Sequence, residues 1–461
     1  MIHQRWCGIA EGNDDVALVE ADRHVSFREL LEIEGDLASE LQRRGVEAGD
    51  AVLAQLPNGL EFAASFLATA RLGAVLVPVN PKLLESEISH YHSRIAPRVA
   101  LSVESFPRER RRQEGVGRSA RRDGGPYEGE AVFLSTSGST GLPKIVPRTH
   151  TGLLFTVSAV ASVLGLRSKD RFLGVAPFHH AHGFVNSLLL SLLSGACLAT
   201  VPRFVPRATI ELVRRLEITA ILASPFVFAA IAESLEDGSE LPSLRVCVSG
   251  GAALPTGVRQ GFLDKTGLHI RELYGCSEAG TIGIQREGEV RAFRPNPGVD
   301  VRIVDESGGS LAAGSVGEVA ARSPTVTPGY VGAGGAVDRF VDGYLLTGDF
   351  GYLDESGELI LQGRKIAHLN VAGVKVDPVE IEKVLQEIPG VEQAYVTAAP
   401  GPRGLEAIKA VIALRDGVEV SRRSILSYCR ERLSEHKLPR LVEFVDRDSG
   451  DILGKARRVE G

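Results

Sequence analysis

Short apolar runs alternate with longer helical patterns through most of this 461-residue chain, and this alternation limits the folds that are open to it. Residues 27–45 have the apolar spacing of a helix, whereas residues 51–57 form a short apolar run typical of a buried strand. Strands that alternate with helices predict an α/β fold. The same pattern is seen in residues 60–74, 74–80, 218–225, 244–252 and 268–275.

The later part of the chain predicts a β-rich subdomain and then a second domain. Residues 298–363 are strand-like and are punctuated by Gly and Pro, and a chain of this length exceeds what one core usually supports. We therefore predict a large N-terminal α/β domain with a β-rich subdomain over residues 1–363, and a small α+β C-terminal domain over residues 364–461. The strands and helices expected in the second domain are 368–376, 378–388, 391–399, 406–414, 421–433 and 440–446.

Composition excludes several classes of function. A net charge of -6 gives no general attraction to nucleic acid or to an anionic membrane surface. The five cysteines are scattered without paired spacing, and the first residues have no apolar core of signal-peptide length, so a cytoplasmic location is predicted. Residues 184–201 approach the length of a membrane span, but polar residues interrupt them and predict a buried helix that leads into a strand. The arginine-rich residues 107–126 are interpreted as an exposed connection.

A glycine- and hydroxyl-rich segment, STSGSTGLPK at 135–144, follows a predicted strand at 131–134 and precedes a predicted helix at 149–166. Backbone N–H groups and hydroxyls in such a loop can hold phosphate oxygens, although a solvated linker is the alternative. The segment is not a Walker A loop, because its lysine follows a proline and is followed by isoleucine. A P-loop kinase or ATPase is therefore disfavoured.

Seven segments, in this order, carry a resemblance to a known family. They are STSGSTGLPK (135–144), PFHHAHG (177–183), SGGAALP (249–255), YGCSEAG (274–280), LLTGDFGYLDESGELILQGR (345–364), GVKVDPVEIE (373–382) and HKLPR with GK (436–455). Together they resemble the adenylate-forming superfamily of acyl- and aryl-CoA synthetases, peptide-synthetase adenylation domains and beetle luciferases. The resemblance implies an AMP-forming ligase with ATP, Mg²⁺ and CoA as partners, and a C-terminal domain that moves between two half-reactions.

In that family the glycine loop holds the β- and γ-phosphates of ATP. Most of the 52 basic residues here are arginine, so lysine at two family positions, Lys144 and Lys455, supports the resemblance. A compact ammonium suits a point contact to developing charge. The loop residues to which the resemblance gives this role are Thr136, Ser137, Gly138, Ser139, Thr140, Gly141 and Lys144.

The resemblance also implies which residues bind the nucleoside. Asp349 resembles the carboxylate that accepts both ribose hydroxyls, which an ionised carboxylate can do with its two oxygens. Arg364 resembles an arginine that also contacts the nucleotide. The residues assigned to the adenine site are Gly250, Gly251, Ala252, Tyr274, whose ring would stack on the base, and Gly275.

Catalytic roles follow from the same resemblance. Ser277 and Glu278 would reach the α-phosphate and Mg²⁺, with Glu278 as the metal ligand, and Lys455 would stabilise charge during adenylation. His180 would border the acid substrate, and His182 would line the same pocket. Three histidines in four positions, with no carboxylate or thiolate beside them, do not predict a zinc site.

The acid is predicted to be a small aryl or acyl carboxylic acid without an α-amino group, because the segment FVNSLLL (184–190), soon after His182, has no acidic residue to pair with a buried ammonium. The resemblance implies that the thiol acceptor is CoA, reached near Gly373, and the alternative acceptor is the phosphopantetheine of an acyl carrier protein. A catalytically silent nucleotide- or acyl-binding protein is the alternative from another class. Ile366 departs from the family, whose hinge at this position is Asp or Lys, and this puts thioester transfer in more doubt than adenylation.

Overall fold

The computed structural model describes most of the chain and divides it into two compact units. The first unit comprises residues 1–81, 91–135 and 145–363, and the second comprises residues 82–90, 136–144 and 364–461. The assignment of adenylation to residues 1–363 and of movement to residues 364–461 stays a prediction. The described residues are 1–106, 127, 129–136, 144–201, 203–236, 241–289, 291–331, 339–364, 369–371, 374–376, 378–401, 406–415, 418 and 420–445.

The predicted α/β fold is confirmed, and its first sheet contains the strands that flank the glycine loop. Among the described residues, five strands pair in the order β5-β3-β4-β6-β7. The buried residues of β3, β4 and the middle of β6 are apolar, as is usual in parallel sheets whose two faces are covered. The bounds are β3 Ala51–Gln55, β4 Val75–Pro78, β5 Val99–Ser102, β6 Glu130–Thr136 and β7 Lys144–Thr149.

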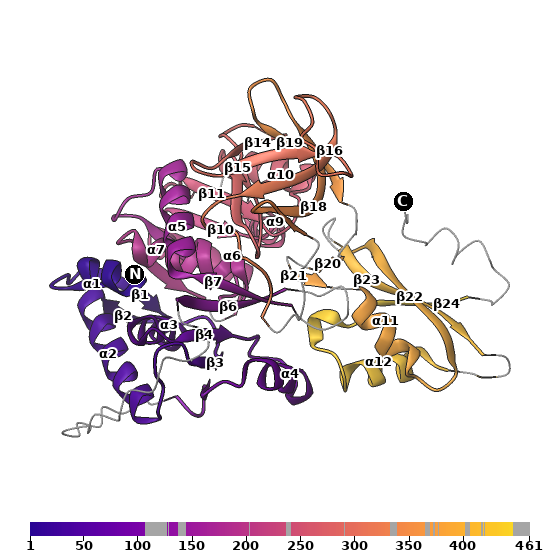
Figure 1. Ribbon diagram of the computed structural model, residues 1–461, viewed down its shortest axis with the longest axis horizontal. Coiled ribbons are helices and arrows are strands. Elements are labelled where there is room, and N and C mark those ends of the chain that lie inside the picture. Colours follow the sequence, from indigo (N-terminus) through magenta and orange to yellow (C-terminus); the bar gives the residue numbers. More distant parts are fainter. Residues whose placement is uncertain are drawn as a thin grey trace. The chain divides into compact units, whose positions relative to one another are not determined.

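The glycine loop does not lead directly into a helix, as the sequence had suggested. Lys144 instead begins β7, and β6 and β7 are neighbouring strands that run side by side in Figure 1. The loop thus joins two neighbouring strands, and its residues 137–143 lie outside the described residues. The arginine-rich connection, residues 107–126, lies outside them as well.

A larger sheet forms the centre of the first unit. Within the described ranges, fourteen strands belong to it, with β9-β8-β10-β11-β12 parallel and β12-β13-β14-β19 antiparallel. The bounds are β1 Val16–Glu20, β2 Arg23–Ser26, β8 Arg171–Gly174, β9 Cys197–Thr200, β10 Ala220–Ala223, β11 Val246–Gly250, β12 Arg271–Cys276, β13 Gly280–Ile284, β14 Ala292–Pro295, β15 Asp300–Val304, β16 Gly317–Arg322, β17 Phe340–Val341, β18 Tyr344–Leu353 and β19 Leu359–Arg364.

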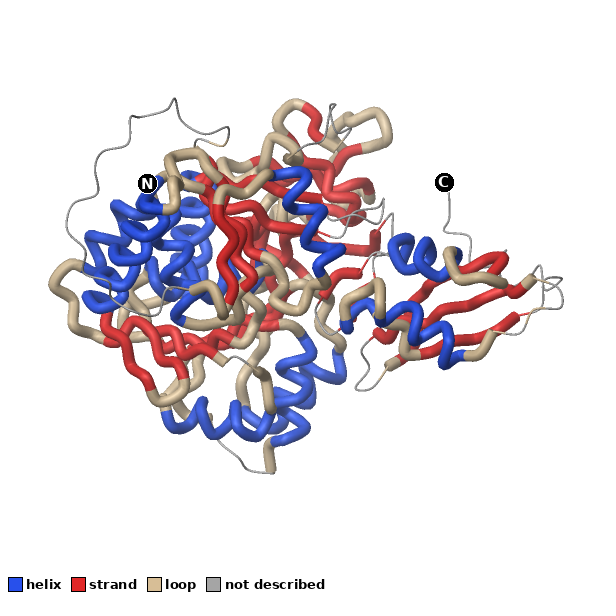
Figure 2. The backbone as a smooth tube through the Cα atoms, turned by 90° about the horizontal axis from the view of Figure 1, so that it is seen from below, coloured by secondary structure: helices blue, strands red, loops and turns tan. Residues whose placement is uncertain are grey.

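Alternating side chains of β10 enter two different cores. Ala220 and Leu222 pack into one apolar cluster, whereas Ile221 and Ala223 pack into another. This is the two-residue period of a strand whose faces are both buried. Figure 2 shows the helices of the first unit along the outside of its strands. Their bounds are α1 Ile2–Ala10, α2 Phe27–Arg43, α3 Leu60–Leu72, α4 Glu85–Ile95, α5 His150–Leu164, α6 Ala181–Gly183, α7 Leu190–Leu193, α8 Pro206–Arg215, α9 Pro225–Ser234 and α10 Thr256–Thr266.

The long apolar stretch at 184–201 is a buried helical segment that leads into a strand, as expected. A π-helix, Phe184–Leu189, joins α6 to α7, and Cys197 then begins β9. Across the part of the chain that is described, helices fall short of the length and apolar character that crossing a membrane requires.

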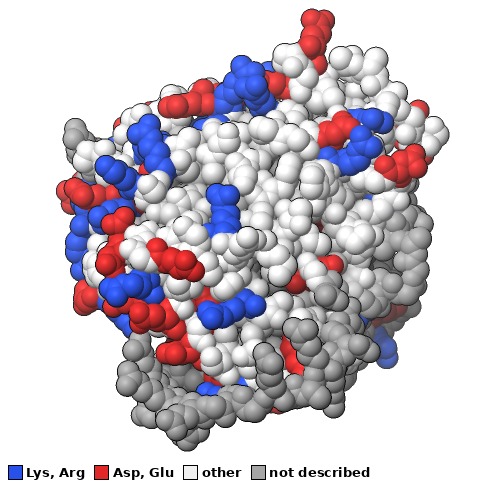
Figure 3. Space-filling model, turned by 60° about the vertical axis from the view of Figure 1, so that its left-hand side comes forward, with Lys and Arg blue, Asp and Glu red and all other residues white. Residues whose placement is uncertain are grey.

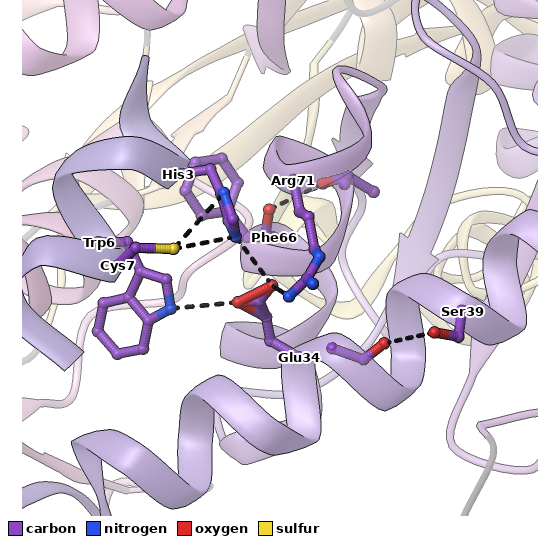
Figure 4. Close-up of polar contacts among 9 residues, drawn as sticks. His3, Trp6, Cys7, Glu34, Ser39, Phe66 and Arg71 are labelled. Atoms are coloured by element: carbon purple, nitrogen blue, oxygen red, sulfur yellow. Dashed lines mark hydrogen bonds and ion pairs between the residues drawn. The ribbon is translucent and has the colours of Figure 1, made fainter. Parts of the chain in front are cut away.

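A buried carboxylate anchors the N-terminal helix. Glu34 of α2 is fully buried, and its oxygens bind Arg71 at 3.1 Å, His3 at 3.1 Å and the Trp6 indole at 3.2 Å (Figure 4). Because a buried charge is costly unless it is paired, these three partners fix α1 against α2 and α3.

The second unit is the small α+β fold that was predicted, with one difference. The expected strand at 368–376 is a short hairpin, in which Leu369 pairs with Val376 and Val371 with Val374. In Figure 1 the three longer strands β22, β23 and β24 lie side by side. The bounds are β20 Leu369–Val371, β21 Val374–Val376, α11 Pro378–Gln386, β22 Val391–Pro400, β23 Glu406–Leu414, α12 Arg422–Arg430, a 3₁₀-helix Glu435–Lys437 and β24 Leu441–Val445.

Surface charge is mixed. On the face drawn in Figure 3, basic and acidic side chains are interspersed, and broad uncharged areas separate them. The described residues on this face form no extended surface of one sign, such as nucleic-acid binding would need.

Candidate active site

The centre of the candidate site is Tyr274, in the middle of β12. Its side chain is buried, and its hydroxyl donates a 2.8 Å hydrogen bond to Oδ2 of Asp349. Burial, and then the negative charge of Asp349, raise the pKa of Tyr274 well above its usual value, so the phenol stays protonated and remains a donor. Two residues assigned separately from the sequence, one to adenine and one to ribose, are thus in direct contact.

Asp349 is held by the turn that precedes it within β18. Gly348 has a φ of +76°, a left-handed conformation that glycine adopts without strain. The Asp349 amide donates to Thr347 Oγ1 at 3.1 Å, and Thr347 Oγ1 donates to the Val319 carbonyl at 2.9 Å. The Thr-Gly-Asp sequence therefore fixes where the carboxylate lies.

Gly250, at the end of β11, lies against a histidine ring. A Cβ atom at Gly250 would be 2.6 Å from Cε1 of His182, so only glycine lets the ring and the backbone approach this closely. His182 Nδ1 is 3.3 Å from Nδ2 of Asn186, and burial lowers the pKa of His182 to about 4. His182 is consequently neutral at physiological pH. Gly251 follows with a φ of +84°, and Ala252 comes next in the same turn.

Glu278 lies in the connection between β12 and β13 and is 8% exposed. Its Oε1 accepts a 2.8 Å hydrogen bond from the Tyr330 hydroxyl, and its carbonyl accepts a 2.8 Å bond from the Thr327 amide. Gly275 lets the connection fold tightly, because a Cβ there would be 2.1 Å from the Gly280 carbonyl oxygen. The carboxylate is therefore fixed on a tight turn that leads out of the strand bearing Tyr274.

His180 is half-buried, and burial lowers its pKa to about 4. Its ring centroid is 4.3 Å from that of His179. The segment that leads to it is held by Asn58, which donates to the carbonyls of Gly174 at 3.1 Å and Ala176 at 2.8 Å and accepts from the Phe178 amide at 2.8 Å. Like His182, His180 enters the site as a neutral imidazole.

The structure places the other predicted site residues as follows. Thr136 ends β6, Lys144 begins β7, and Arg364 ends β19. The Oγ1 atom of Thr136 is buried and has no hydrogen-bond partner among the described residues. The predicted residues that lie outside the described residues are Ser137, Gly138, Ser139, Thr140, Gly141, Ile366, Gly373 and Lys455.

Two supporting residues were not predicted from the sequence. Arg148 is buried and contacts the backbone of Ser277, and Tyr330 holds Glu278. Arg148 stands at a buried position of β7, but the sequence did not predict this strand, so no local pattern marked the arginine. Tyr330 lies far from Glu278 in sequence, so nothing in the local pattern could have linked the two residues.

The side chains present suit a nucleotide with a hard metal ion. Glu278 is a buried carboxylate on the turn that follows Tyr274, and Tyr274 contacts a second carboxylate, Asp349. Across the described part of the chain, His, Cys, Asp and Glu side chains form no cluster of three that could hold a metal ion. Mg²⁺ is typically bound by one or two carboxylates together with substrate phosphates, so Glu278 could hold it in the company of a nucleotide.

Comparison with known proteins gives matches along nearly the whole chain. Residues 6–331 match the family model described as AMP-binding enzyme, and residues 380–455 match the model for the AMP-binding enzyme C-terminal domain. Feruloyl-CoA synthase of Amycolatopsis sp is 31% identical, over 95% of this chain and 94% of its own length. The long-chain-fatty-acid–CoA ligase of Bacillus subtilis is 26% identical, over 96% and 91%.

Solved structures of similar fold cover the same span. The amide bond synthetase McbA from Marinactinospora thermotolerans has a TM-score of 0.82 and 28% identity, with 96% of this chain and 95% of that chain covered. o-Succinylbenzoate CoA synthetase from Bacillus subtilis has a TM-score of 0.85 and 24% identity, with the same coverage of 96% and 95%, and supports the fold alone.

Proposed function

This chain belongs to the family of AMP-binding enzymes, and we propose that it is an AMP-forming acid–thiol ligase, which activates a carboxylic acid with ATP and transfers the acyl group to CoA. Its relatives include proteins named as CoA ligases for aromatic and for fatty acids. The acid is proposed to be an aryl or acyl carboxylic acid without an α-amino group.

The observation that carries this proposal is the contact between Tyr274 and Asp349, with Glu278 on the turn that follows Tyr274. A buried aromatic ring, a carboxylate acceptor for a ribose diol and a buried carboxylate for a metal ion are the groups that a nucleoside triphosphate requires. Tyr274 donates a 2.8 Å hydrogen bond to Asp349, and Glu278 accepts one of 2.8 Å from Tyr330. A catalytically silent relative would have no need to keep Glu278 fixed in this way.

The first half-reaction makes an acyl adenylate. A carboxylate oxygen of the acid forms a bond to the α-phosphorus of ATP, and the bond from that phosphorus to the bridging oxygen of the β-phosphate breaks, so that pyrophosphate leaves. Mg²⁺, held by Glu278 and the phosphates, would neutralise charge on the phosphate oxygens. Lys144 and Lys455 are proposed to stabilise the charge that develops on the transferring group.

The remaining nucleotide contacts follow from the family resemblance. The loop of Thr136, Ser137, Gly138, Ser139, Thr140 and Gly141 is proposed to hold the β- and γ-phosphates, and Arg364 is proposed to contact the nucleotide. Among the described residues, the buried Oγ1 of Thr136 has no hydrogen-bond partner, and this supports the role because a buried hydroxyl is costly unless a partner satisfies it.

In the second half-reaction the thiol sulfur forms a bond to the acyl carbon, the bond from that carbon to the AMP oxygen breaks, and the thiol proton is released. His180 and His182 are proposed to border the acid, where neutral rings exclude water without adding charge. The segment around Gly373 is proposed to line the thiol path after residues 364–461 move. The phosphopantetheine of a carrier protein is the alternative acceptor.

The test is acid-dependent exchange of labelled pyrophosphate into ATP, with a panel of aryl, short-chain and medium-chain acids. Asp349→Asn should raise KM for ATP at least tenfold, because an amide offers one acceptor where the carboxylate offers two. Asp342→Asn is the matched control: Asp342 is exposed and has a φ of +49°, which asparagine adopts readily. No acid-dependent exchange with any acid, from folded enzyme, would refute the proposal.

A further inference from the structure

Arg148 is a buried cation next to the candidate site, and adenylation as proposed above assigns it no role. Its side chain is 1% exposed, and it lies in β7, four residues after Lys144. Removing a guanidinium from water is costly unless hydrogen bonds replace its hydration. The other fully buried residues of β7, Ile145 and Val146, are apolar, so a buried arginine in this strand calls for a function.

The hydrogen bonds of Arg148 join three separate segments of the first unit. Nη1 donates to the carbonyl of Ser277 at 2.6 Å, and Nη2 donates to Oγ1 of Thr325. Thr156 of α5 donates to the same Thr325 oxygen at 3.1 Å. The rigid fork of the guanidinium thus connects β7 both to the turn that carries Ser277 and Glu278 and to the segment around Thr325.

That segment also holds the turn from a second point. The Thr327 amide, two residues beyond Thr325, donates to the Glu278 carbonyl at 2.8 Å. The Ser277 and Glu278 carbonyls therefore each accept a hydrogen bond, one from Arg148 and one from a segment that Arg148 itself binds. Losing the guanidinium would remove the first of these bonds, and also the bond that ties Arg148 to the segment that makes the second.

The charge of Arg148 acts in the same place. Burial lowers its pKa to about 10, while the negative charges of Glu278 and Glu130 oppose this change, so the group stays protonated at neutral pH. Its two described hydrogen bonds go to neutral oxygens of Ser277 and Thr325.

We propose that Arg148 is a positioning residue for adenylation, whose guanidinium holds the Ser277–Glu278 turn in the conformation that binds the metal–nucleotide complex. The inference rests on the proposed function, because Glu278 is taken as the metal ligand. It assigns a role to a residue that touches neither substrate nor metal itself. Arg148 thereby connects β7, which follows the glycine loop, to the turn that carries Glu278.

The test compares Arg148→Met, Arg148→Lys and Thr325→Val with wild type. The first readout is the affinity for Mn²⁺·ATP, measured without acid by the electron paramagnetic resonance of Mn²⁺. The second is amide hydrogen exchange of the peptide that spans residues 274–282. Arg28→Met is the matched control, because Arg28 is exposed and pairs with exposed Asp14 at the surface.

We expect Arg148→Met to weaken Mn²⁺·ATP binding at least tenfold and to speed exchange in residues 274–282, whereas Arg28→Met changes neither. Arg148→Lys should be intermediate, since an ammonium keeps the charge but lacks the fork. If Arg148→Met does not fold, the inference is tested with Thr325→Val, which removes one hydrogen-bond acceptor of Arg148 and keeps the arginine. This variant should weaken Mn²⁺·ATP binding about threefold or more.

The inference would be overturned if folded Arg148→Met showed the Mn²⁺·ATP affinity and the amide exchange of the wild type. If Arg148→Met does not fold, the same result in Thr325→Val would overturn it. Failure of the proposed function is distinguishable from this, because wild-type enzyme would then show neither Mn²⁺·ATP binding nor acid-dependent pyrophosphate exchange.

Discussion

Replacing Gly280 by alanine should destabilise the first unit more than the same change at Gly267, another left-handed glycine of that unit. Gly280 has a φ of +69°, which costs an L-residue about 1–2 kcal/mol. A Cβ there would also be 3.0 Å from Nη2 of Arg148 and 3.1 Å from the Oγ1 atoms of Thr156 and Thr325. These three groups are buried and bonded to one another, so none can move away without losing a hydrogen bond.

The size of the effect follows from adding the two costs. Forcing a methyl group into a packed site costs about 1–3 kcal/mol, so Gly280→Ala should lower the free energy of unfolding by roughly 2–5 kcal/mol. Gly267 provides a matched control. It has the same φ of +69°, ends α10 and has no atom within 4 Å of a built Cβ, so alanine there should cost only the backbone term of about 1–2 kcal/mol.

The assay is urea unfolding followed by the fluorescence of the single tryptophan, Trp6, which is buried in the first unit. If the slopes of the transitions agree, the two midpoints can be compared directly. Equal destabilisation by Gly280→Ala and Gly267→Ala would refute the argument, because it would mean that the Arg148 network yields to a methyl group at no cost.

Three further predictions concern stability and reactivity. Arg71→Met should lower the free energy of unfolding by about 3 kcal/mol in the same assay, because it removes a partner of fully buried Glu34; an unchanged midpoint would contradict this. Burial lowers the pKa values of His180 and His182 to about 4, so the unfolded chain binds more protons between pH 4 and 6.5. The free energy of unfolding should therefore fall as the pH is lowered through this window. His180→Gln should make this fall less steep, as measured by urea unfolding at a series of pH values. An unaltered dependence on pH would argue against a buried neutral ring. Burial also raises the pKa of Cys247, so its alkylation by iodoacetamide, followed by peptide mass spectrometry, should be slower in native than in urea-unfolded protein, and equal rates would show that the site is open.

Much of the fold could be predicted because apolar residues recur along the chain with the spacing of strands and helices. The apolar run at 218–225 contains β10, whose alternate residues enter two cores, and the strand predicted at 406–414 agrees with β23. Short elements were less predictable. The run at 368–376 was expected to be one strand, but Leu369–Val371 and Val374–Val376 are two strands that pair with each other.

Some residues of the candidate site could be predicted from the sequence and others could not. Tyr274, Asp349 and Glu278 could be recognised because each stands in a distinctive local motif, and the structure adds the contacts that hold them. Arg148 and Tyr330 could not be recognised by motif, because their roles depend on segments that meet only in the folded chain. The strand β7 was missed for a physical reason: Pro147 interrupts its apolar pattern and argues against an interior strand.

The most direct test of the proposed function is mass spectrometry of reactions that contain Mg·ATP and a panel of aryl, short-chain and medium-chain acids, each with and without CoA. An acyl-CoA, formed together with AMP and pyrophosphate only in the samples that contain CoA, is the predicted result. Accumulation of acyl-AMP with no thioester in either sample would contradict CoA as the acceptor, and release of orthophosphate without AMP would contradict adenylation itself.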